Sequence, residues 1–179
     1  MTKPAIHLHI RPVCIDDAAA TARILNDIIA TQLLTAMEKP ITVAEQAEYI
    51  RTFSKSGCFL VAEHIDTQAI VGLQSLEPLQ GGDTATSHIG EISTFIDDTY
   101  RGHGVGTRLT HVLLEEAQKL GYQKIIAYIR ADNTAAQAFY LQQGFRMVGR
   151  LAQHIRYRGG YLDQVLAERL LTNPGTAAT

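Results

Sequence analysis

The stretch Ile89–Leu120, IGEISTFIDDTYRGHGVGTRLTHVLLEEAQKL, decides the fold of this chain. It opens with apolar residues in a pattern typical of a buried strand, in which Ile92, Phe95 and Ile96 supply most of the bulk. A glycine-dense run follows, and from Val105 onward the apolar residues recur at helical spacing. The stretch therefore predicts a strand, a glycine loop and a helix, in that order.

A strand, a glycine loop and a helix in this order form an anion-binding site. The glycines let the backbone approach a ligand closely, and the first N–H groups of the helix point outward at the positive end of its dipole. We therefore expect a phosphorylated ligand here. The residues predicted to contact it are Arg101, Gly102, His103, Gly104, Val105, Gly106 and Thr107.

The spacing of the glycines discriminates between phosphate ligands. The dinucleotide fingerprint G-x-G-x-x-G fails, because Thr107 stands where the third glycine should be. The nucleoside-triphosphate loop fails too, because no Gly-Lys-Ser/Thr follows. The run does match R-x-x-G-x-G through Arg101, Gly104 and Gly106. It resembles the pyrophosphate loop of the GCN5-related N-acetyltransferases (GNAT), which bind acetyl-coenzyme A; a glycine-rich turn before an ordinary helix is the alternative.

A second motif lies downstream, in Arg130–Phe145, RADNTAAQAFYLQQGF. It resembles the family pattern N-x-x-A-x-x-x-Y-x-x-x-G-F, and the matching residues are Asn133, Ala136, Tyr140, Gly144 and Phe145, with Phe139 beside the tyrosine. Two motifs in this order are far more specific than either alone. Glu91, shortly before the glycine loop, resembles the glutamate of the phosphinothricin and amino-acid N-acetyltransferase branch.

The remaining periodicities predict an α/β fold with a single mixed, largely antiparallel sheet flanked by helices. The expected strands cover 6–11, 58–64, 69–76, 89–96, 124–129, 145–151 and 161–171. Four helices are expected. The first is capped by Asp16 and runs through Ile29, and the second starts with a Thr42–Glu45 capping box and ends at Gly57. The other two cover 105–120 and 134–143, and Asn133 caps the last one.

Two predicted strand–helix units, 89–120 and 124–143, should form right-handed crossovers between parallel strands. The family resemblance implies that these central strands splay apart and that coenzyme A enters between them. We expect one acetyltransferase domain over residues 1–172, followed by a disordered tail at 173–179.

Composition excludes several classes of protein. The 179 residues are 46% hydrophobic and carry a net charge of −2, which offers no basic surface for nucleic acid or an anionic membrane. No apolar run approaches the roughly 18 residues of a membrane span, and since Met1–Pro4 lack the apolar segment of a secretory signal, we expect none. Cys14 and Cys58 are too isolated to hold zinc. We expect a cytoplasmic protein without a metal, with acetyl-coenzyme A as cosubstrate.

The resemblance implies acyl transfer from a thioester to an amine. A protonated amine must lose a proton before it can attack, and Glu91 is the candidate base, acting through a water. Tyr140 is the candidate acid for the departing thiolate. Backbone N–H groups around Thr94, Phe95 and Ile96 are the candidate donors to the oxyanion. The alternatives are that Glu91 pairs with a neighbouring cation and that Tyr140 only packs.

The acceptor is less constrained than the donor. The amino-acid branch binds the substrate carboxylate with basic residues near the end of the second hairpin strand, but here the region is Gln74–Gln80, without arginine or lysine. Arg156 or Arg158 could substitute, whereas Glu77 would suit a cationic amine. The resemblance also implies a homodimer.

Three functions follow from these residues. The first is an N-acetyltransferase acting by direct transfer on the primary amine of a small molecule. The second is an acetyltransferase acting on a protein or peptide. The third is a coenzyme A-binding regulator without catalysis, which the presence of both Glu91 and Tyr140 disfavours.

Overall fold

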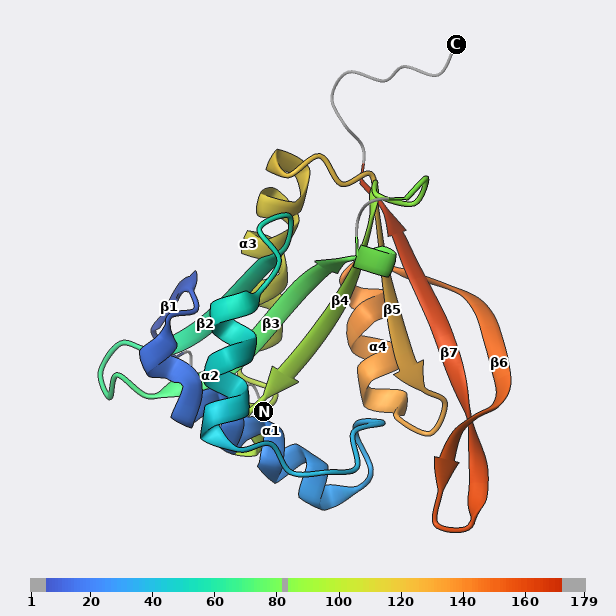
Figure 1. Cartoon of the computed structure of the whole chain (residues 1–179), viewed down its shortest axis with the longest axis horizontal. Helices are drawn as coiled ribbons and strands as arrows, with labels where there is room; N and C mark the ends of the chain where they lie inside the picture. Colours follow the sequence, from blue (N-terminus) through green and yellow to red (C-terminus); the bar gives the residue numbers. More distant parts are fainter. Residues whose placement is uncertain (1–5, 82–83, 172–179) are drawn as a thin grey trace.

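The computed structural model describes residues 6–81 and 84–171, so the predicted tail at 173–179 lies outside the described residues. In this described part of the chain, one seven-stranded sheet carries helices on both faces (Figure 1). Its strands are β1 (Leu8–Pro12), β2 (Cys58–His64), β3 (Ile70–Pro78), β4 (Ile89–Ile96), β5 (Lys124–Arg130), β6 (Arg146–Tyr157) and β7 (Gly160–Leu170). The helices are α1 (Ala18–Thr31), α2 (Val43–Thr52), α3 (Val105–Lys119) and α4 (Thr134–Gln142), with short 3-10 turns η1 (Ile15–Asp17), η2 (Leu79–Gly81) and η3 (Asp98–Tyr100).

The sheet has the order β1-β2-β3-β4-β5-β7-β6. Among the described strands, β4 and β5 pair in parallel and the other neighbours pair antiparallel. The predicted mixed, largely antiparallel fold is confirmed. The first strand–helix unit does connect two paired parallel strands. The second does not, because β7 lies between β5 and β6 and pairs with both.

The parallel pair separates soon after it begins. β4 and β5 are in register only from Ile89–Glu91, which pairs with Lys124–Ile126. Beyond Glu91 the two strands diverge, and the lower part of β4 is paired on one side only, with β3 (Figure 1). The predicted splay is therefore present.

Each face of the sheet has its own hydrophobic core. On one face, α3 buries Leu109 and Leu113 completely against β2, β3 and β5. On the other face, α1 buries Ile24 and Ile28 against β2 and β3. The apolar stripe of α3 recurs at helical spacing, so the helix predicted from Val105 forms as expected and fixes the glycine loop at its N-terminus.

Two predicted helix caps are confirmed. The Oγ1 of Thr42 accepts from the N–H of Glu45 at 3.1 Å, and the Glu45 carboxylate accepts from the N–H of Thr42 at 2.8 Å. The Oδ1 of Asn133 accepts from the N–H of Ala136 at 3.0 Å at the start of α4. Both caps satisfy donors that have no partner within the first turn of a helix.

The predicted cap at Asp16 is wrong. The 3-10 turn η1 occupies this position and α1 begins at Ala18. The neighbouring Asp17 is held by the Arg11 guanidinium, at 2.7 and 2.8 Å, and by the N–H of Cys14. The arginine comes from β1, so this ion pair is a tertiary contact that the local sequence pattern does not predict.

The second helix ends five residues before the predicted Gly57. At Phe53 the backbone leaves the helical conformation, with φ −55° and ψ 140°. The Phe53 ring packs against Tyr49 and Phe59. Gly57 serves another purpose: a Cβ there would lie 2.7 Å from the Leu76 carbonyl oxygen. Of the two closing strands, β6 is longer than expected, because register shifts let it continue to Tyr157, whereas β7 covers 160–170 and so nearly matches the predicted 161–171.

None of the helices in the described part of the chain is long and apolar enough to cross a membrane.

Replacement of Leu109 by alanine should lower the free energy of unfolding by about 2 to 5 kcal/mol, because it leaves a cavity under α3. The matched control is Leu141→Ala on the surface of α4, where the side chain is 53% exposed and the loss should stay below about 1 kcal/mol. Chemical denaturation of both variants measures the difference. Equal losses would show that α3 does not anchor the core.

Candidate active site

The glycine loop leaves the N-terminus of α3 without a side-chain cap. Gly104 is the N-cap residue, and both it and Gly102 have φ of 78°, a left-handed conformation that favours glycine. A Cβ at Gly104 would meet nothing within 4 Å, so the backbone conformation, rather than crowding, requires glycine here. The N–H groups of the first turn are therefore free to bind an anion.

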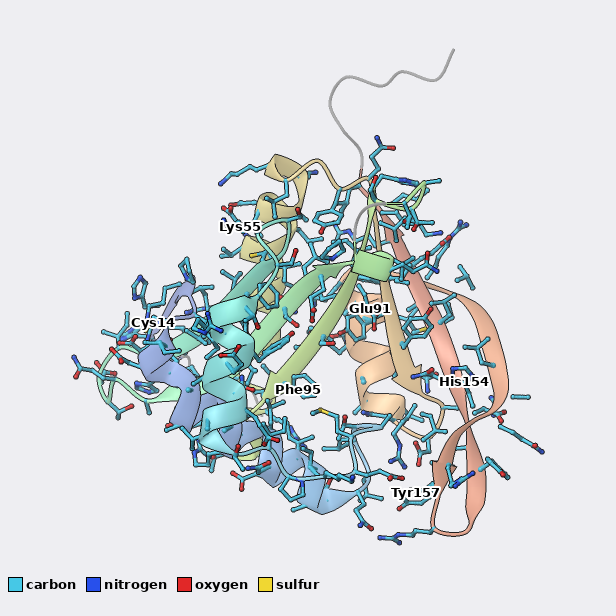
Figure 2. All side chains as sticks on the ribbon, viewed as in Figure 1. Cys14, Lys55, Glu91, Phe95, His154 and Tyr157 are labelled. Carbon is cyan, nitrogen blue, oxygen red and sulfur yellow. The ribbon has the colours of Figure 1, made fainter. Side chains whose placement is uncertain are left out.

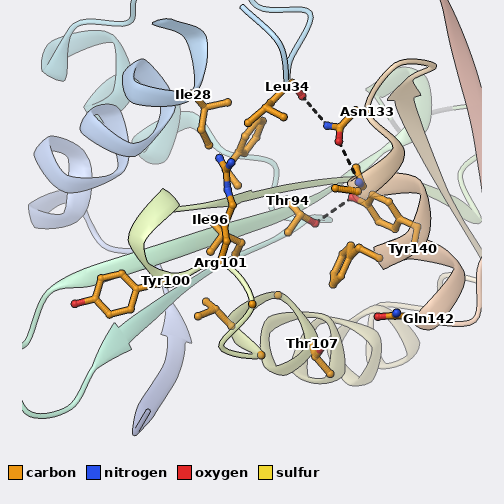
Figure 3. Close-up of a pocket in the computed structure, with 18 residues that line it drawn as sticks. Ile28, Leu34, Thr94, Ile96, Tyr100, Arg101, Thr107, Asn133, Tyr140 and Gln142 are labelled. Carbon is orange, nitrogen blue, oxygen red and sulfur yellow. Dashed lines mark hydrogen bonds between the residues drawn. The ribbon is translucent and has the colours of Figure 1, made fainter. Parts of the chain in front are cut away.

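A cavity of about 480 Å³ begins at this loop and runs along the unpaired part of β4 to α4 (Figure 3). It collects most of the residues predicted to bind the cofactor: Thr94, Phe95, Ile96, Arg101, Gly102, Gly104, Val105, Gly106, Thr107, Asn133, Ala136 and Tyr140. They come from three separate elements. We call this space the donor cavity, and the contacts of these residues with acetyl-coenzyme A stay predictions.

His103 is not brought into the donor cavity. Its ring turns towards Tyr100, with 6.3 Å between centroids, and its own N–H donates to the Tyr100 carbonyl oxygen at 3.4 Å. The backbone contact predicted for His103 is thus occupied within the loop.

The sequence motifs missed several residues of the donor cavity, namely Ile28, Leu34, Tyr100, Ala135, Phe139 and Gln142. Phe139 was visible inside the second motif, and the structure explains its position: a Cβ on Gly106 would lie 3.0 Å from its ring. This glycine therefore allows α3 and α4 to approach each other. Ile28 and Leu34 come from the α1 region, and no local signal marks them.

Asn133 and Arg101 have structural partners in addition to their place in the cavity. The Asn133 Nδ2 donates to the Leu34 carbonyl oxygen at 3.4 Å, which ties α4 to the loop after α1 (Figure 3). The Arg101 guanidinium pairs with Asp98 at 2.9 Å. The same side chains therefore help to hold the cavity walls.

The free edge of β4 carries backbone donors. The N–H of Asp97 donates to the Val71 carbonyl oxygen at 3.0 Å, towards β3. Because successive N–H groups of a strand alternate in direction, those of Thr94 and Ile96 point away from β3, to the side that β5 has left. These two donors lie where the sequence predicted an oxyanion site.

Tyr140 is buried at the end of a hydrogen-bonded chain. The Gln74 Nε2 donates to Thr94 Oγ1 at 2.8 Å and to Thr110 Oγ1 at 2.9 Å, and Thr94 Oγ1 lies 3.0 Å from the Tyr140 hydroxyl (Figure 3). Since Thr94 accepts from Gln74, its own hydrogen is available to Tyr140, and the phenol can donate into the cavity. Burial raises the pKa of Tyr140 to about 12. Gln74 and Thr110 belong to neither sequence motif, so the sequence did not indicate that they support Tyr140.

Glu91 lies where β4 and β5 separate (Figure 2). Its strand partner on β3 is Glu77. The Glu91 side chain is half-buried, and this burial raises its pKa, with the Glu77 charge adding to the effect. Along β4, Glu91 alternates with Ile92 and shares its face with Ser93 and Phe95. This face is opposite the one that packs on α3.

A second cavity, of about 380 Å³, lies on that face beneath α2, and we call it the acceptor cavity. Tyr49, Glu77 and Ser93 line it, and Phe95 lines both it and the donor cavity. Phe95 is therefore a wall that the two spaces share, and Glu91 is not among the described residues that line either of them.

The predicted carboxylate-binding residues lie elsewhere. Arg156 and Arg158 line a third cavity, of about 310 Å³, together with the buried Arg130. The guanidinium of Arg130 is 4.6 Å from the centre of the Tyr157 ring. We call this space the arginine cavity.

Comparison with known proteins agrees with this geometry. Residues 7–146 match the model of the family described as acetyltransferase (GNAT) domain. The chain belongs to the GNAT acetyltransferase family. It is therefore an acetyl-coenzyme A-dependent N-acetyltransferase, and the resemblance inferred from its motifs is confirmed.

Relatives of this acetyltransferase are named for several acceptors. YwnH of Bacillus subtilis, provisionally described as a phosphinothricin acetyltransferase, is 30% identical over 72% of this chain and 78% of its own length. A ribosomal-protein-alanine N-acetyltransferase of Brucella melitensis is 28% identical, with a TM-score of 0.84 over 91% of this chain and 99% of that one. The fold also matches, with a TM-score of 0.86 at 23% identity, a phosphinothricin acetyltransferase of Sinorhizobium meliloti solved with acetyl-coenzyme A, over 100% of this chain and 94% of that one.

Replacement of Gly104 by valine should weaken acetyl-coenzyme A binding at least tenfold, about 1.4 kcal/mol, because a β-branched residue resists φ of 78° and the loop N–H groups turn away from the phosphates. The control is Gly149→Val in β6, where a Cβ has open space and no unusual φ is needed. Calorimetry measures both affinities, with thermal melting to verify folding. A folded Gly104 variant that binds as tightly as the parent would refute the loop assignment.

Proposed function

We propose that this acetyltransferase moves an acetyl group directly from acetyl-coenzyme A to the primary amine of a small molecule. The observation that supports this most is that the donor and acceptor cavities share Phe95 as a wall, with Tyr140 lining the donor side and Glu77, the strand partner of Glu91, lining the acceptor side. A thioester in one space and an amine in the other would reach each other without a covalent enzyme intermediate.

Glu91 is suited to take the proton of the amine. The raised pKa of this carboxylate makes it a stronger base than an ordinary glutamate. The ammonium transfers its proton to Glu91, through a water, and the nitrogen lone pair then attacks the thioester carbon. Thr94 and Ile96 would offer their N–H groups to the oxygen that becomes negative.

Tyr140 is suited to stabilise the thiolate as the carbon–sulfur bond breaks. With a pKa of about 12, the phenol holds its proton more tightly than a thiol of pKa about 8.5. The role of Tyr140 is therefore to donate a hydrogen bond to the thiolate. The proton that converts the thiolate to a thiol is one of the two that the ammonium loses on becoming an amide. Over the cycle, one ammonium and one thioester give an amide, a thiol and a proton.

A peptide acceptor is the second candidate, favoured by the likeness to the ribosomal-protein-alanine enzyme. The acceptor cavity supports the small molecule instead, because α2 covers it and its lining is mostly apolar. Thiol release with a mixed panel of amines, amino acids and peptides distinguishes the two. Thiol release with peptides alone would overturn the proposal. Absence of thiol release with every member of the panel would favour a regulator without catalysis.

A homodimer and a cytoplasmic location remain predictions. Sedimentation of the purified chain tests the first, and fractionation of cells that express it tests the second.

Glu91→Gln should reduce kcat/KM about 10²- to 10⁴-fold near neutral pH, because the amide cannot accept the proton. Part of the loss should return at high pH, where the free amine is already neutral. A deficit of equal size at every pH would show that Glu91 positions the substrate, and no deficit would remove it from the mechanism.

Glu77→Gln tests the role of the Glu91 carboxylate from its neighbour. Glu77 raises the pKa of Glu91 through charge repulsion, so its removal should lower that pKa. The rising limb of kcat/KM against pH, which follows ionisation of Glu91, should then move to lower pH. An unmoved limb would mean that another group is titrating.

Tyr140→Phe should lower kcat about ten- to a hundredfold and leave acetyl-coenzyme A affinity nearly unchanged, because the hydrogen bond to the leaving thiolate is lost together with the one from Thr94. Thr94→Val removes the donor to Tyr140 and should give a smaller loss of the same kind. Single-turnover kinetics measures the chemical step. An unaltered rate in the Phe variant would leave Tyr140 a packing residue.

A further inference from the structure

The acceptor cavity combines aromatic surface with negative charge. Part of its wall is aromatic and consists of Tyr49, Phe59 and Phe95, with 5.8 Å between the ring centres of Tyr49 and Phe59. Glu77 lies in the wall, and no lysine, arginine or histidine is among the described residues that line it. The space therefore favours an occupant with an apolar body and a positive group.

A second carboxylate, that of Glu91, lies next to Glu77 on the neighbouring strand. Glu77 and Glu91 are directly opposite each other on β3 and β4, which places their Cβ atoms about 4.5 to 5.5 Å apart. Neither carboxylate has an ion-pair partner among residues 6–81 and 84–171; Tyr49 donates its hydroxyl to Glu77. A cation between the two carboxylates would relieve their repulsion.

An α-amino acid meets a difficulty in this arrangement. Its nitrogen and carboxylate carbon are bonded to the same Cα, so they lie only about 2.5 Å apart. With the nitrogen near Glu91, the carboxylate must enter the same cavity, next to Glu77 and without a cationic partner. The cost of an unpaired charge there opposes binding.

The arginine cavity does not remove this difficulty. Arg156 and Arg158 line it, but its wall shares only Met37 with the acceptor cavity. With its nitrogen near Glu77 and Glu91, an α-amino acid keeps its carboxylate about 2.5 Å away in the acceptor cavity, where no described lining residue is an arginine. The substitute for the missing basic residues of β3 is therefore in the wrong place for an α-amino acid.

We infer that the acceptor is a primary amine with an apolar or aromatic body and no carboxylate on the carbon that bears the nitrogen. This inference rests on the proposed function, since it takes the space beneath α2 as the acceptor site. Glu77 is then a specificity residue that holds the ammonium, and Glu91 receives its proton.

The wall under α2 also offers a hydrogen bond. The amide of Gln46 is 2% exposed, and its Nε2 has no partner among the described residues. An orphan donor of this kind is costly in a folded protein. Because Gln46 also lines the acceptor cavity, an acceptor group of the occupant is a candidate partner for this donor.

The test compares acceptors that differ only at the carboxylate. We would measure kcat/KM for phenethylamine, phenylalanine and phenylalanine methyl ester with the full chain and saturating acetyl-coenzyme A. Phenethylamine should exceed phenylalanine at least tenfold, and the ester, which keeps the bulk but not the charge, should also exceed phenylalanine. Equal or better use of phenylalanine would overturn the inference. A poor ester together with poor phenylalanine would show exclusion by size and would overturn the charge argument.

Glu77→Gln should reduce the advantage of phenethylamine over phenylalanine, because it removes both the attraction for the ammonium and the repulsion of the carboxylate. The control is Glu115→Gln on the exposed surface of α3, where the advantage should not change. An advantage retained in the Glu77 variant would remove that residue from recognition.

Binding measurements separate failure of this inference from failure of the proposed function. Calorimetry of phenethylamine and of phenylalanine, each added to the chain saturated with coenzyme A, reports the preference without turnover. Preferential binding of phenethylamine without any thiol release from acetyl-coenzyme A would overturn the proposed function and uphold the preference of the cavity. Preferential binding of phenylalanine would overturn the inference whether or not the enzyme turns over.

Discussion

The separation of β5 from β4 after Glu91 is the constraint on which the site depends. A continued parallel pair would satisfy the N–H groups of Thr94 and Ile96 with β5 carbonyl oxygens. It would also fill the space that becomes the donor cavity. The sheet thus gives up ladder hydrogen bonds at its centre, and the exposed strand edge becomes available for a ligand.

The same separation connects the two faces of the sheet. Residues of a strand alternate between its faces, so Thr94 belongs to the side of α3 and α4 while Glu91 and Phe95 belong to the side of α1 and α2. In an intact sheet these groups would be isolated from one another. The proposed transfer, from a thioester on one face to an amine on the other, uses the place where the pair opens.

Burial divides the chemistry between the two proposed catalytic groups. Both pKa values are raised by loss of solvent, but the consequences differ. Glu91 becomes a better base than an ordinary glutamate, whereas Tyr140 becomes a weaker acid and hence a hydrogen-bond donor. The chain from Gln74 through Thr94 orients that donor.

The sequence by itself determined the fold class, the glycine loop, the start of α3 and the caps at Thr42 and Asn133, because periodicity and capping act within a few residues. It also identified Glu91 and Tyr140 as candidates. Only the tertiary structure decided which side chains surround them: the Arg11–Asp17 pair that displaced a predicted cap, Gln74 behind Tyr140, Glu77 opposite Glu91, and the arginines set apart from the acceptor cavity. Such contacts join residues distant along the chain, and their energies depend on strand register and helix packing, which no local pattern encodes.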